Sequence, residues 1–348
     1  MQPVLVAVEA HFERWSGKGA GSVDRDVLGT DEPSQIAEIF ERFCVEQLGS
    51  APVGGLFYTA SSGCVLGVHL ENEADVVVKA YQSRWKESFL AAVQSGEERA
   101  ADGGIPCPRP LAAPTPIRAG RPNLAVVETW LPDPGLRPGG SPTARGVSAR
   151  GLAGQIALCT GLPASDRLRS HPLSSADAQL YPEPHSPLFD FESTAAGAEW
   201  IDELARRASL LRAQDESAPV VAHTDWSARN VRFDEARLLA VYDWDSLALV
   251  PESAALGQAA MTWSVTADPG GTEFPRLDSV LAYMEDYSEG GERVLTDRQR
   301  RAARASAAWV LAYTARCEHS LAARGLARED QSTARERLAD IGAELLAP

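Results

Sequence analysis

The sequence predicts an α/β (α+β) fold in which a small antiparallel sheet precedes a mostly helical region. Residues 55–81 hold short apolar runs typical of strands, whereas helical patterns dominate after Thr194. Between these regions, residues 132–146 (PDPGLRPGGSPTARG) form the clearest linker, because proline and glycine interrupt regular structure. At 348 residues the chain is long enough for one large or two medium domains, each with its own core.

The first fifty residues contain one amphipathic helix candidate. In the segment PSQIAEIFERFCVEQLG the apolar side chains recur at helical spacing, and the glycine that ends it, Gly49, is a typical helix stop. The preceding segment, residues 16–33, is predicted to be a loop. The extreme N-terminus, MQPVLVAVEAHFERW, lacks a basic region and a small-residue cleavage site, so we do not expect a signal peptide.

The next eighty residues predict a small sheet with one helix packed on it. The runs GCVLGVHL and DVVVKAY flank the turn ENEA, a pattern that indicates an antiparallel hairpin, and LFYTASSG leads into it. The segment RWKESFLAAVQSGEERAADGG predicts a helix that ends at Gly103 and Gly104. IPCPRPL then continues as an extended, proline-restricted segment, and NLAVVETWL is a further buried strand.

In the second half, residues 165–193 form an irregular stretch that is long for a compact domain. A substrate-covering loop and a surface excursion both fit it. The longest helix candidate is residues 297–325, DRQRRAARASAAWVLAYTARCEHSLAARG.

Composition excludes several classes of function. The formal net charge of -15 argues against nucleic acid as a partner, because phosphate binding requires clustered Lys and Arg. The acidity fits a cationic ligand, and it equally fits a need for solubility alone. The five cysteines are scattered without a C-x-x-C pair, which argues against a disulfide framework or zinc site and fits the cytoplasm. No run of 18 apolar residues exists, so no membrane span is expected.

The segment 220–247, VVAHTDWSARNVRFDEARLLAVYDWDSL, concentrates polar residues among apolar ones. Asp225 and Asn230 lie in a loop between two predicted strands, PVVAH and LLAVYDW, and Asp243 follows the apolar run of the second. Buried carboxylates are costly unless they are paired or bind a cation. Such oxygen ligands suit Mg2+ bound to phosphates, and a neighbouring carboxylate could accept the proton of a hydroxyl. A hydrogen-bonded acid–Asn turn is the structural alternative.

These residues carry a family resemblance. HTDWSARN fits the pattern H-x-D-x-x-x-x-N, and the Asp of VYDWD follows thirteen residues after the Asn. Together they resemble the catalytic and metal-binding loops of the aminoglycoside phosphotransferase and choline kinase-like family, a small-molecule branch of the protein-kinase-like fold. The resemblance covers roughly residues 50–345. It implies an N-terminal extension (1–50), a nucleotide-binding N-lobe (51–131) and a helical C-lobe (132–348) with the catalytic loop and acceptor site.

The resemblance also implies roles for individual residues. Asp225 would be the catalytic base, and Asn230 and Asp243 would hold Mg2+ on the phosphates of ATP or GTP. His223 would brace the loop through a hydrogen bond. Lys79, at the end of an apolar strand, resembles the Lys that bridges the α- and β-phosphates, although a lone Lys at such a position commonly just extends to water.

Two further N-lobe features match the family less closely. The segment TASSG (59–63) resembles the loop over the nucleotide phosphates, where Ser61, Ser62 and Gly63 would offer backbone N–H groups, but it also fits an ordinary turn. The family pairs the Lys with a Glu on the following helix. Glu98 is our choice for that partner. The other residues at suitable distances are Glu87, Gln94 and Glu97, and a Gln in this role would depart from the pattern.

The segment VVETWLPDPG (126–135) resembles the hinge between the lobes. Backbone groups around Glu128 and Trp130 would meet the adenine, although Trp130 also fits a plain core position. Asp245 follows the second metal ligand by two residues, and it would either shape the substrate pocket or cap the next helix.

The family binds its acceptor on the C-lobe. Arg316, Glu318 and His319 lie inside an otherwise apolar helix, where a buried charge needs a partner or a ligand. An internal ion pair or a wet helix face is the alternative. Glu252 and Trp263 are further acceptor candidates.

The sequence therefore predicts an ATP-dependent kinase that phosphorylates a hydroxyl of a small molecule. An aminoglycoside or another antibiotic, and hence antibiotic resistance, comes first. An amino sugar, a sugar or an amino alcohol comes second. A nucleotide-binding pseudokinase is the alternative from another class. A protein kinase is disfavoured, because neither D-F-G nor A-P-E is present.

Overall fold

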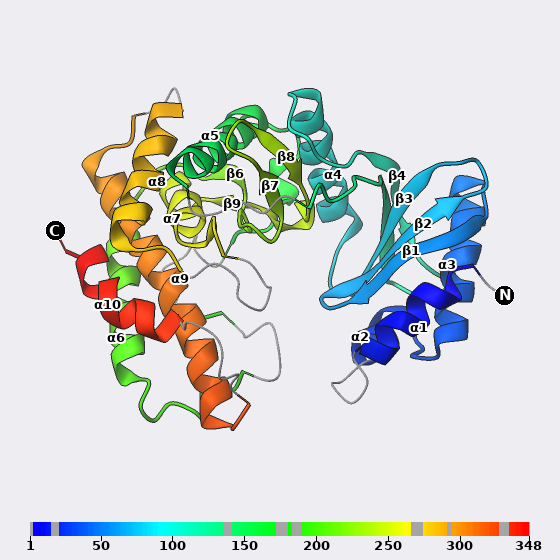
Figure 1. Cartoon of the computed structure of the whole chain (residues 1–348), viewed down its shortest axis with the longest axis horizontal. Helices are drawn as coiled ribbons and strands as arrows, with labels where there is room; N and C mark the ends of the chain where they lie inside the picture. The colour runs from blue at the N-terminus through cyan, green and yellow to red at the C-terminus, as the bar shows by residue number, and fades with distance from the viewer. Residues whose placement is uncertain are drawn as a thin grey trace. The chain divides into compact units, whose positions relative to one another are not determined.

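The structure describes residues 3–14, 21–135, 141–171, 180–182, 189–265, 274–290, 294–326 and 334–347. In this computed structural model the chain divides into two units. Unit 1 comprises Met1–Ala101 and Cys107–Pro132, and unit 2 comprises Asp102–Pro106 and Asp133–Pro348 (Figure 1). A five-stranded sheet belongs to unit 1, and most of the helices belong to unit 2.

The sheet of unit 1 is antiparallel throughout. Its strands are β1 (Pro52–Ala60), β2 (Gly63–Leu70), β3 (Asp75–Tyr81), β4 (Pro110–Pro116) and β5 (Leu124–Thr129), arranged in the order β1-β2-β3-β5-β4. The predicted hairpin is confirmed as β2 and β3. The predicted helix that follows is confirmed as α4 (Glu87–Asp102).

Alternation of side chains along each strand gives the sheet two different faces. Lys79 pairs with Val65 on one side and Val126 on the other, so these three side chains share one face. The opposite face carries Leu66 and Val78, which are fully buried in the hydrophobic core of the unit. That core also includes the helices before the sheet.

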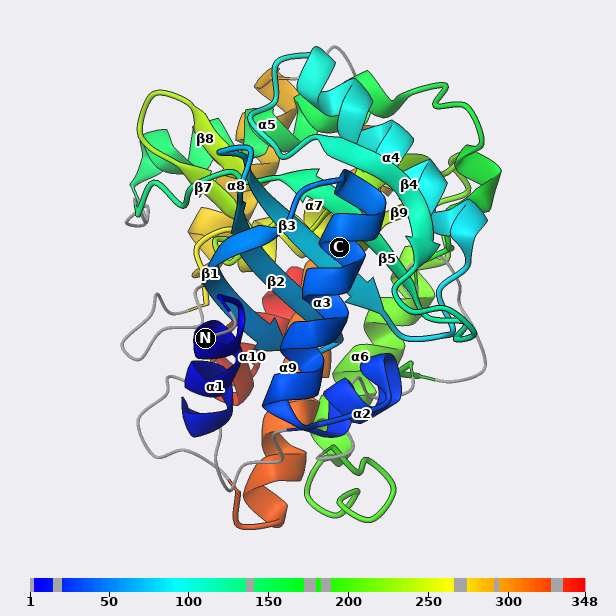
Figure 2. The same ribbon diagram turned by 90° about the vertical axis from the view of Figure 1, so that its right-hand side faces the viewer.

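Three helices cover this apolar face: α1 (Leu5–Arg14), α2 (Ser22–Leu28) and α3 (Pro33–Leu48). Figure 2 shows α3 running across the sheet. The predicted amphipathic helix is confirmed as α3, which ends at left-handed Gly49. The prediction of a loop over 16–33 was wrong for 22–28, because Val27 and Leu28 bury fully and α2 forms between two left-handed glycines.

Unit 2 consists mainly of α5 (Pro142–Cys159), α6 (Glu199–Arg212), α7 (Glu252–Thr262), α8 (Leu277–Gly290), α9 (Asp297–Ala323) and α10 (Ala334–Leu345). The longest predicted helix is confirmed as α9, which starts with a capping box between Thr296 and Gln299. The predicted linker 132–146 was wrong at its end. Ser141 caps α5 and Pro142 occupies its first turn, two features that favour a helix start.

Two small sheets hold the polar segment 220–247. The strands β6 (Val220–His223) and β9 (Leu247–Val250) pair, as do β7 (Val231–Phe233) and β8 (Leu238–Val241). The two predicted strands exist as β6 and β8, but each pairs with a strand that the sequence pattern did not reveal. A short 3-10 helix, η3 (Trp244–Ser246), precedes β9, and another, η1 (Ser165–Arg167), lies near the start of the irregular stretch.

Of the irregular stretch 165–193, residues 172–179 and 183–188 lie outside the described residues. Ser170 forms an isolated bridge with Leu249 of β9. Among the helices of the described ranges, none has the length and apolar character needed to cross a membrane.

Candidate active site

The loop between β6 and β7 brings the predicted base and the predicted amide ligand into contact. The side-chain amide of Asn230 donates to Oδ2 of Asp225 at 2.8 Å and to the Asp225 carbonyl at 3.2 Å. The hydroxyl of Ser227 donates to Oδ1 of the same carboxylate at 3.1 Å. Ser227 was missed by sequence reasoning, although it lies between the two motif residues. The loop thus fixes the orientation of the Asp225 carboxylate from both sides.

Asp243 is linked to this loop through the backbone. The N–H of Tyr242 donates to the carbonyl of Asn230 at 2.9 Å, so the residue before Asp243 is bound directly to the predicted amide ligand. Asp243 itself has a left-handed backbone, with φ of 61° and ψ of 48°. Non-glycine residues adopt this conformation rarely, and such residues cluster at functional sites. The three predicted residues Asp225, Asn230 and Asp243 are all half-buried.

His223 supports the loop through two hydrogen bonds of its ring. Its Nε2 lies 2.8 Å from the carbonyl of Tyr242, and its Nδ1 lies 3.0 Å from Oγ of Ser246. A carbonyl can only accept, so Nε2 carries the proton and Ser246 donates to Nδ1. Burial lowers the pKa of His223, which keeps the ring neutral. The rings of Trp226 and Trp244 contact it edge-on, and the hydrogen bond matches the bracing role predicted for it.

Arg232 is a second residue that sequence reasoning missed. Its guanidinium binds Asp133 in a bidentate manner, with both N–O distances at 3.0 Å. The same group donates through Nη1 to the carbonyls of Ala228 and Arg229, at 2.7 and 2.9 Å. Arg232 therefore fastens the loop between β6 and β7 to the segment that follows residue 132. No sequence signal separated this Arg, inside the strand VRF, from an ordinary surface cation.

In unit 1, Lys79 pairs with Glu128 at 2.8 Å, and both side chains are largely buried. The choice of Glu98 as its partner is therefore replaced by Glu128. Glu98 lies on the exposed side of α4, whereas Glu97 is buried on that helix. Gln94 is engaged elsewhere, because its amide donates to the carbonyl of Ala112 at 2.8 Å.

The segment around Ser61 is a tight turn between β1 and β2. The N–H of Ser61 donates to the carbonyl of Gly63 at 3.0 Å, so this group is used within the turn, and Ser61 and Ser62 are exposed. Gly63 is required by space, because a Cβ there would lie 2.6 Å from the carbonyl oxygen of Ala80. The turn is thus held by its own backbone and by close approach of β3.

Around the predicted hinge, two backbone donors are bound within unit 1. The N–H of Trp130 donates to the carbonyl of Asp75 at 3.0 Å, and that of Thr129 donates to Arg109 at 2.9 Å. The indole of Trp130 is half-buried and contacts the ring of Phe57, with centroids 5.5 Å apart. These two N–H groups are consequently not free to bind a nucleobase in this arrangement.

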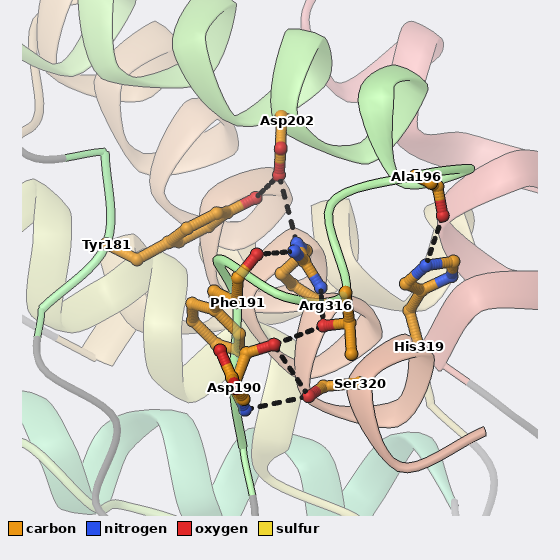
Figure 3. Close-up of polar contacts among 9 residues, drawn as sticks. Tyr181, Asp190, Phe191, Ala196, Asp202, Arg316, His319 and Ser320 are labelled. Carbon is orange, nitrogen blue, oxygen red and sulfur yellow. Dashed lines mark hydrogen bonds and ion pairs between the residues drawn. The ribbon is translucent and has the colours of Figure 1, made fainter. Parts of the chain in front are cut away.

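The polar residues of α9 bind other parts of the fold (Figure 3). Arg316, with 1% of its side chain exposed, pairs with Asp202 at 3.5 Å and donates to Thr194 and to the Phe191 carbonyl. His319 Nε2 lies 3.0 Å from the Ala196 carbonyl. The internal ion pair, the alternative that the sequence left open, is thus present.

Glu318 completes this set of tertiary contacts. Its carboxylate accepts the N–H groups of Ala334 and Arg335, at 2.8 and 3.1 Å. These are the first two residues of α10, so Glu318 satisfies donors that a helix start leaves without an internal partner.

The remaining acceptor candidates also have partners within unit 2. Glu252 is buried at the start of α7 and accepts a hydrogen bond from the Tyr287 hydroxyl at 2.8 Å. Trp263 is a core residue that packs against Phe233 and Tyr283. Asp245 is half-buried in η3 and does not cap a helix, because a strand, β9, follows.

Comparison with known proteins identifies the family. The model of the phosphotransferase enzyme family matches residues 67–303, more than half of the chain. No curated protein shows significant sequence similarity to the chain.

Among solved structures, an amicoumacin kinase in complex with AMP-PNP, Ca2+ and amicoumacin is similar, at 10% identity, over 84% of this chain and 87% of that one, with a TM-score of 0.57. A spectinomycin phosphotransferase with bound ADP and spectinomycin is 14% identical over 89% and 94%, with a TM-score of 0.52. A type I macrolide 2'-phosphotransferase is 15% identical over 90% and 98%, with a TM-score of 0.50.

At these identities the structural similarities establish the fold, and they confirm the predicted kinase-like α/β architecture. The family model carries the membership, since it spans the Lys79 strand and the whole segment 220–247. The chain therefore belongs to the phosphotransferase enzyme family and is a phosphotransferase with the fold of the small-molecule kinases.

Proposed function

We propose that this protein transfers the γ-phosphate of ATP to a hydroxyl group of a small molecule. The observation that carries the proposal is the arrangement around Asp225. Its carboxylate is oriented by Asn230 and Ser227, and the backbone of Asn230 is bonded to the residue before left-handed Asp243. We assign nucleotide binding to residues 51–131, and the catalytic loop and acceptor site to residues 132–348.

The donor set near Asp243 fits Mg2+. The amide nitrogen of Asn230 is used by Asp225, which leaves the amide oxygen as its ligand atom. The carboxylate of Asp243 has no hydrogen-bond or ion-pair partner within the described residues, so its charge is available to a cation. Within those residues no cluster of three or more His, Cys, Asp or Glu side chains could hold a metal. A site with one carboxylate and one amide suits Mg2+, which takes further ligands from phosphates.

Each residue of the proposed site has its own role in the reaction. Asp225 accepts the proton of the acceptor hydroxyl and directs that oxygen toward the phosphorus. Lys79, held in place by Glu128, neutralises phosphate charge. His223 and Arg232 position the loop through hydrogen bonds within the fold. Bound Mg2+ would supply charge neutralisation on the phosphate oxygens.

The acceptor that we favour is an antibiotic with free hydroxyl groups, such as an aminoglycoside. Support comes from the similar structures, which are named for amicoumacin, spectinomycin and macrolides. An ATP substrate is supported by the AMP-PNP and ADP in two of them. Antibiotic resistance in the cytoplasm would be the biological role. A kinase of amino sugars, sugars or amino alcohols is the second choice.

The test is ATP consumption with Mg2+ against a panel of aminoglycosides, other antibiotics, amino sugars, sugars and amino alcohols. Turnover that depends on one acceptor, and that is lost in Asp225→Ala but kept in Glu98→Gln, would support the proposal. Glu98 is a suitable control because it is exposed on α4. ATP binding without turnover of any acceptor would favour a pseudokinase, and absence of ATP binding would overturn the proposal.

A further inference from the structure

A buried carboxylate lies behind the turn at Ser61, on the apolar face of the sheet. Asp24 of α2 has no exposed surface, and its Oδ2 has no hydrogen-bond partner within the described residues. Burial of a carboxylate with an unpaired oxygen costs free energy. The activity proposed above does not involve this group.

The other oxygen, Oδ1, binds both strands that flank the turn. It accepts a short hydrogen bond from the hydroxyl of Tyr58 on β1. It also lies 4.0 Å from Sγ of Cys64 on β2, within range of a weak thiol hydrogen bond. In the strand register Ala60 pairs with Cys64, and Tyr58 pairs with Leu66. One carboxylate therefore ties together the two strands immediately before and after residues 61–63.

The surroundings hold this carboxylate rigidly in place. Burial, together with the negative charge of Asp24, raises the pKa of Tyr58, so its hydroxyl stays protonated and donates. The ring of His11 on α1 contacts the ring of Tyr58 edge-on at 5.3 Å. The helix α2 that carries Asp24 begins and ends at left-handed glycines. The N-terminal segment is thus joined to the hairpin of β1 and β2 by a specific polar contact as well as by apolar packing.

We propose that Asp24 is a positioning residue for nucleotide binding, because it fixes the hairpin that presents residues 61–63. The inference rests on the proposed function and on the resemblance of residues 59–63 to the loop that covers the nucleotide phosphates. Ser61 and Ser62 are exposed, and the turn has one hydrogen bond between its own residues, so its order also depends on the strands that flank it. A hairpin that is ordered before ATP arrives does not lose conformational entropy on binding.

The test compares Asp24→Asn, Tyr58→Phe and the double variant with wild type, by steady-state kinetics and by direct ATP binding. Loss of one charge-assisted hydrogen bond is expected to raise the KM and Kd for ATP by about five- to ten-fold. The kcat and the acceptor KM should stay within about two-fold. The double variant should show no more than the larger single effect, because both changes act on the same contact: Asp24→Asn removes its charge and Tyr58→Phe removes its donor.

Asp31→Asn is the matched control. Asp31 follows α2 in the same N-terminal segment and forms an exposed ion pair with Arg25, which contributes little. If Asp24 merely stabilises the fold, its variants will lower kcat in proportion to the folded fraction and leave the ATP KM unchanged, and that result would overturn the inference. Tyr58→Phe keeps the test open should Asp24→Asn fail to fold. Failure of wild type to bind ATP would instead show that the proposed function is wrong.

Discussion

Unit 2 contains two groups of polar residues in apolar surroundings, and they satisfy their charges in different ways. In the loop between β6 and β7, Asp225 receives hydrogen bonds from residues two and five positions away. The carboxylate stays half-buried, with further acceptor capacity on both oxygens. On α9, Arg316 is almost fully buried, and its hydrogen-bond partners lie 122 and 125 residues away.

The two groups differ in whether the fold supplies the partners of their charges. Local hydrogen bonds orient the Asp225 carboxylate, and no ion pair within the described residues neutralises it or the carboxylate of Asp243. The helix α9 neutralises its charges with other segments, at Asp202 and at the start of α10. Polar residues inside an apolar pattern therefore indicate a ligand only when the fold does not supply their partners.

The largest expected effect is the loss of turnover in Asp225→Asn. The substitution removes the proposed base but keeps a side chain of the same shape that can still accept from Ser227. Turnover should fall about a thousand-fold, as expected for loss of general base catalysis. The urea midpoint of unfolding should hardly change. A variant that kept its turnover would show that Asp225 is a structural residue like those of α9.

The second prediction concerns Arg316→Met, which keeps the volume and removes the charge. Asp202 would lose a buried cation, and the Phe191 carbonyl would lose a donor, so unfolding should become easier by about 3 kcal/mol. Urea denaturation measures this change. The acceptor KM of the folded protein should stay within about two-fold. Arg298→Met on the same helix is the control, since its ion pair with Glu216 is exposed.

If Arg316→Met instead raised the acceptor KM while stability stayed constant, Arg316 would be a substrate ligand. The conclusion that the charges of α9 are satisfied within the fold would then be wrong. Asp202→Asn offers an independent check, because it alters the same ion pair from α6.

The sequence predicted what depends on local spacing. Asp225 and Asn230 are five residues apart, so a single loop brings them into contact and the motif reveals it. The helices α3 and α9 follow from apolar periodicity and from their end signals. The hairpin of β2 and β3 follows from two apolar runs around a four-residue turn.

What the sequence could not predict depends on pairing between distant segments. The partner of Lys79 is set by the register of β3 with β5, which places Val77 opposite Glu128. No pattern within α4 reveals that register, so Glu98 was the wrong choice of partner. The partners of Arg316 are equally distant, and α2 is too short for periodicity to detect.

The third prediction is a pH dependence from His223. Its pKa in the folded state is lowered by burial, whereas the unfolded chain has the ordinary value near 6.5. As the pH falls through this value, His223 binds a proton more readily in the unfolded state than in the folded state. The free energy of unfolding should therefore decrease as the pH is lowered from 7 to 5.5.

The measurement is the free energy of unfolding in urea at both pH values, for wild type and His223→Gln. Groups that titrate in both proteins cancel in the difference, so this loss of stability at low pH should be larger in wild type than in the variant. Equal pH dependence in the two proteins would mean that His223 accepts a proton in the fold, contrary to its neutral bracing role.

The smallest effect is expected at Glu318. Glu318→Ala leaves the N–H groups of Ala334 and Arg335 without their acceptor, and loss of such a helix-start acceptor costs about 0.5 to 1 kcal/mol. Glu318→Gln keeps one acceptor oxygen and should lose less. Burial also raises the pKa of Glu318, so its charged form is already disfavoured and the neutral amide is a mild replacement. Urea unfolding of the two variants side by side tests this order. A larger effect on the acceptor KM than on stability would show instead that Glu318 contributes to acceptor binding.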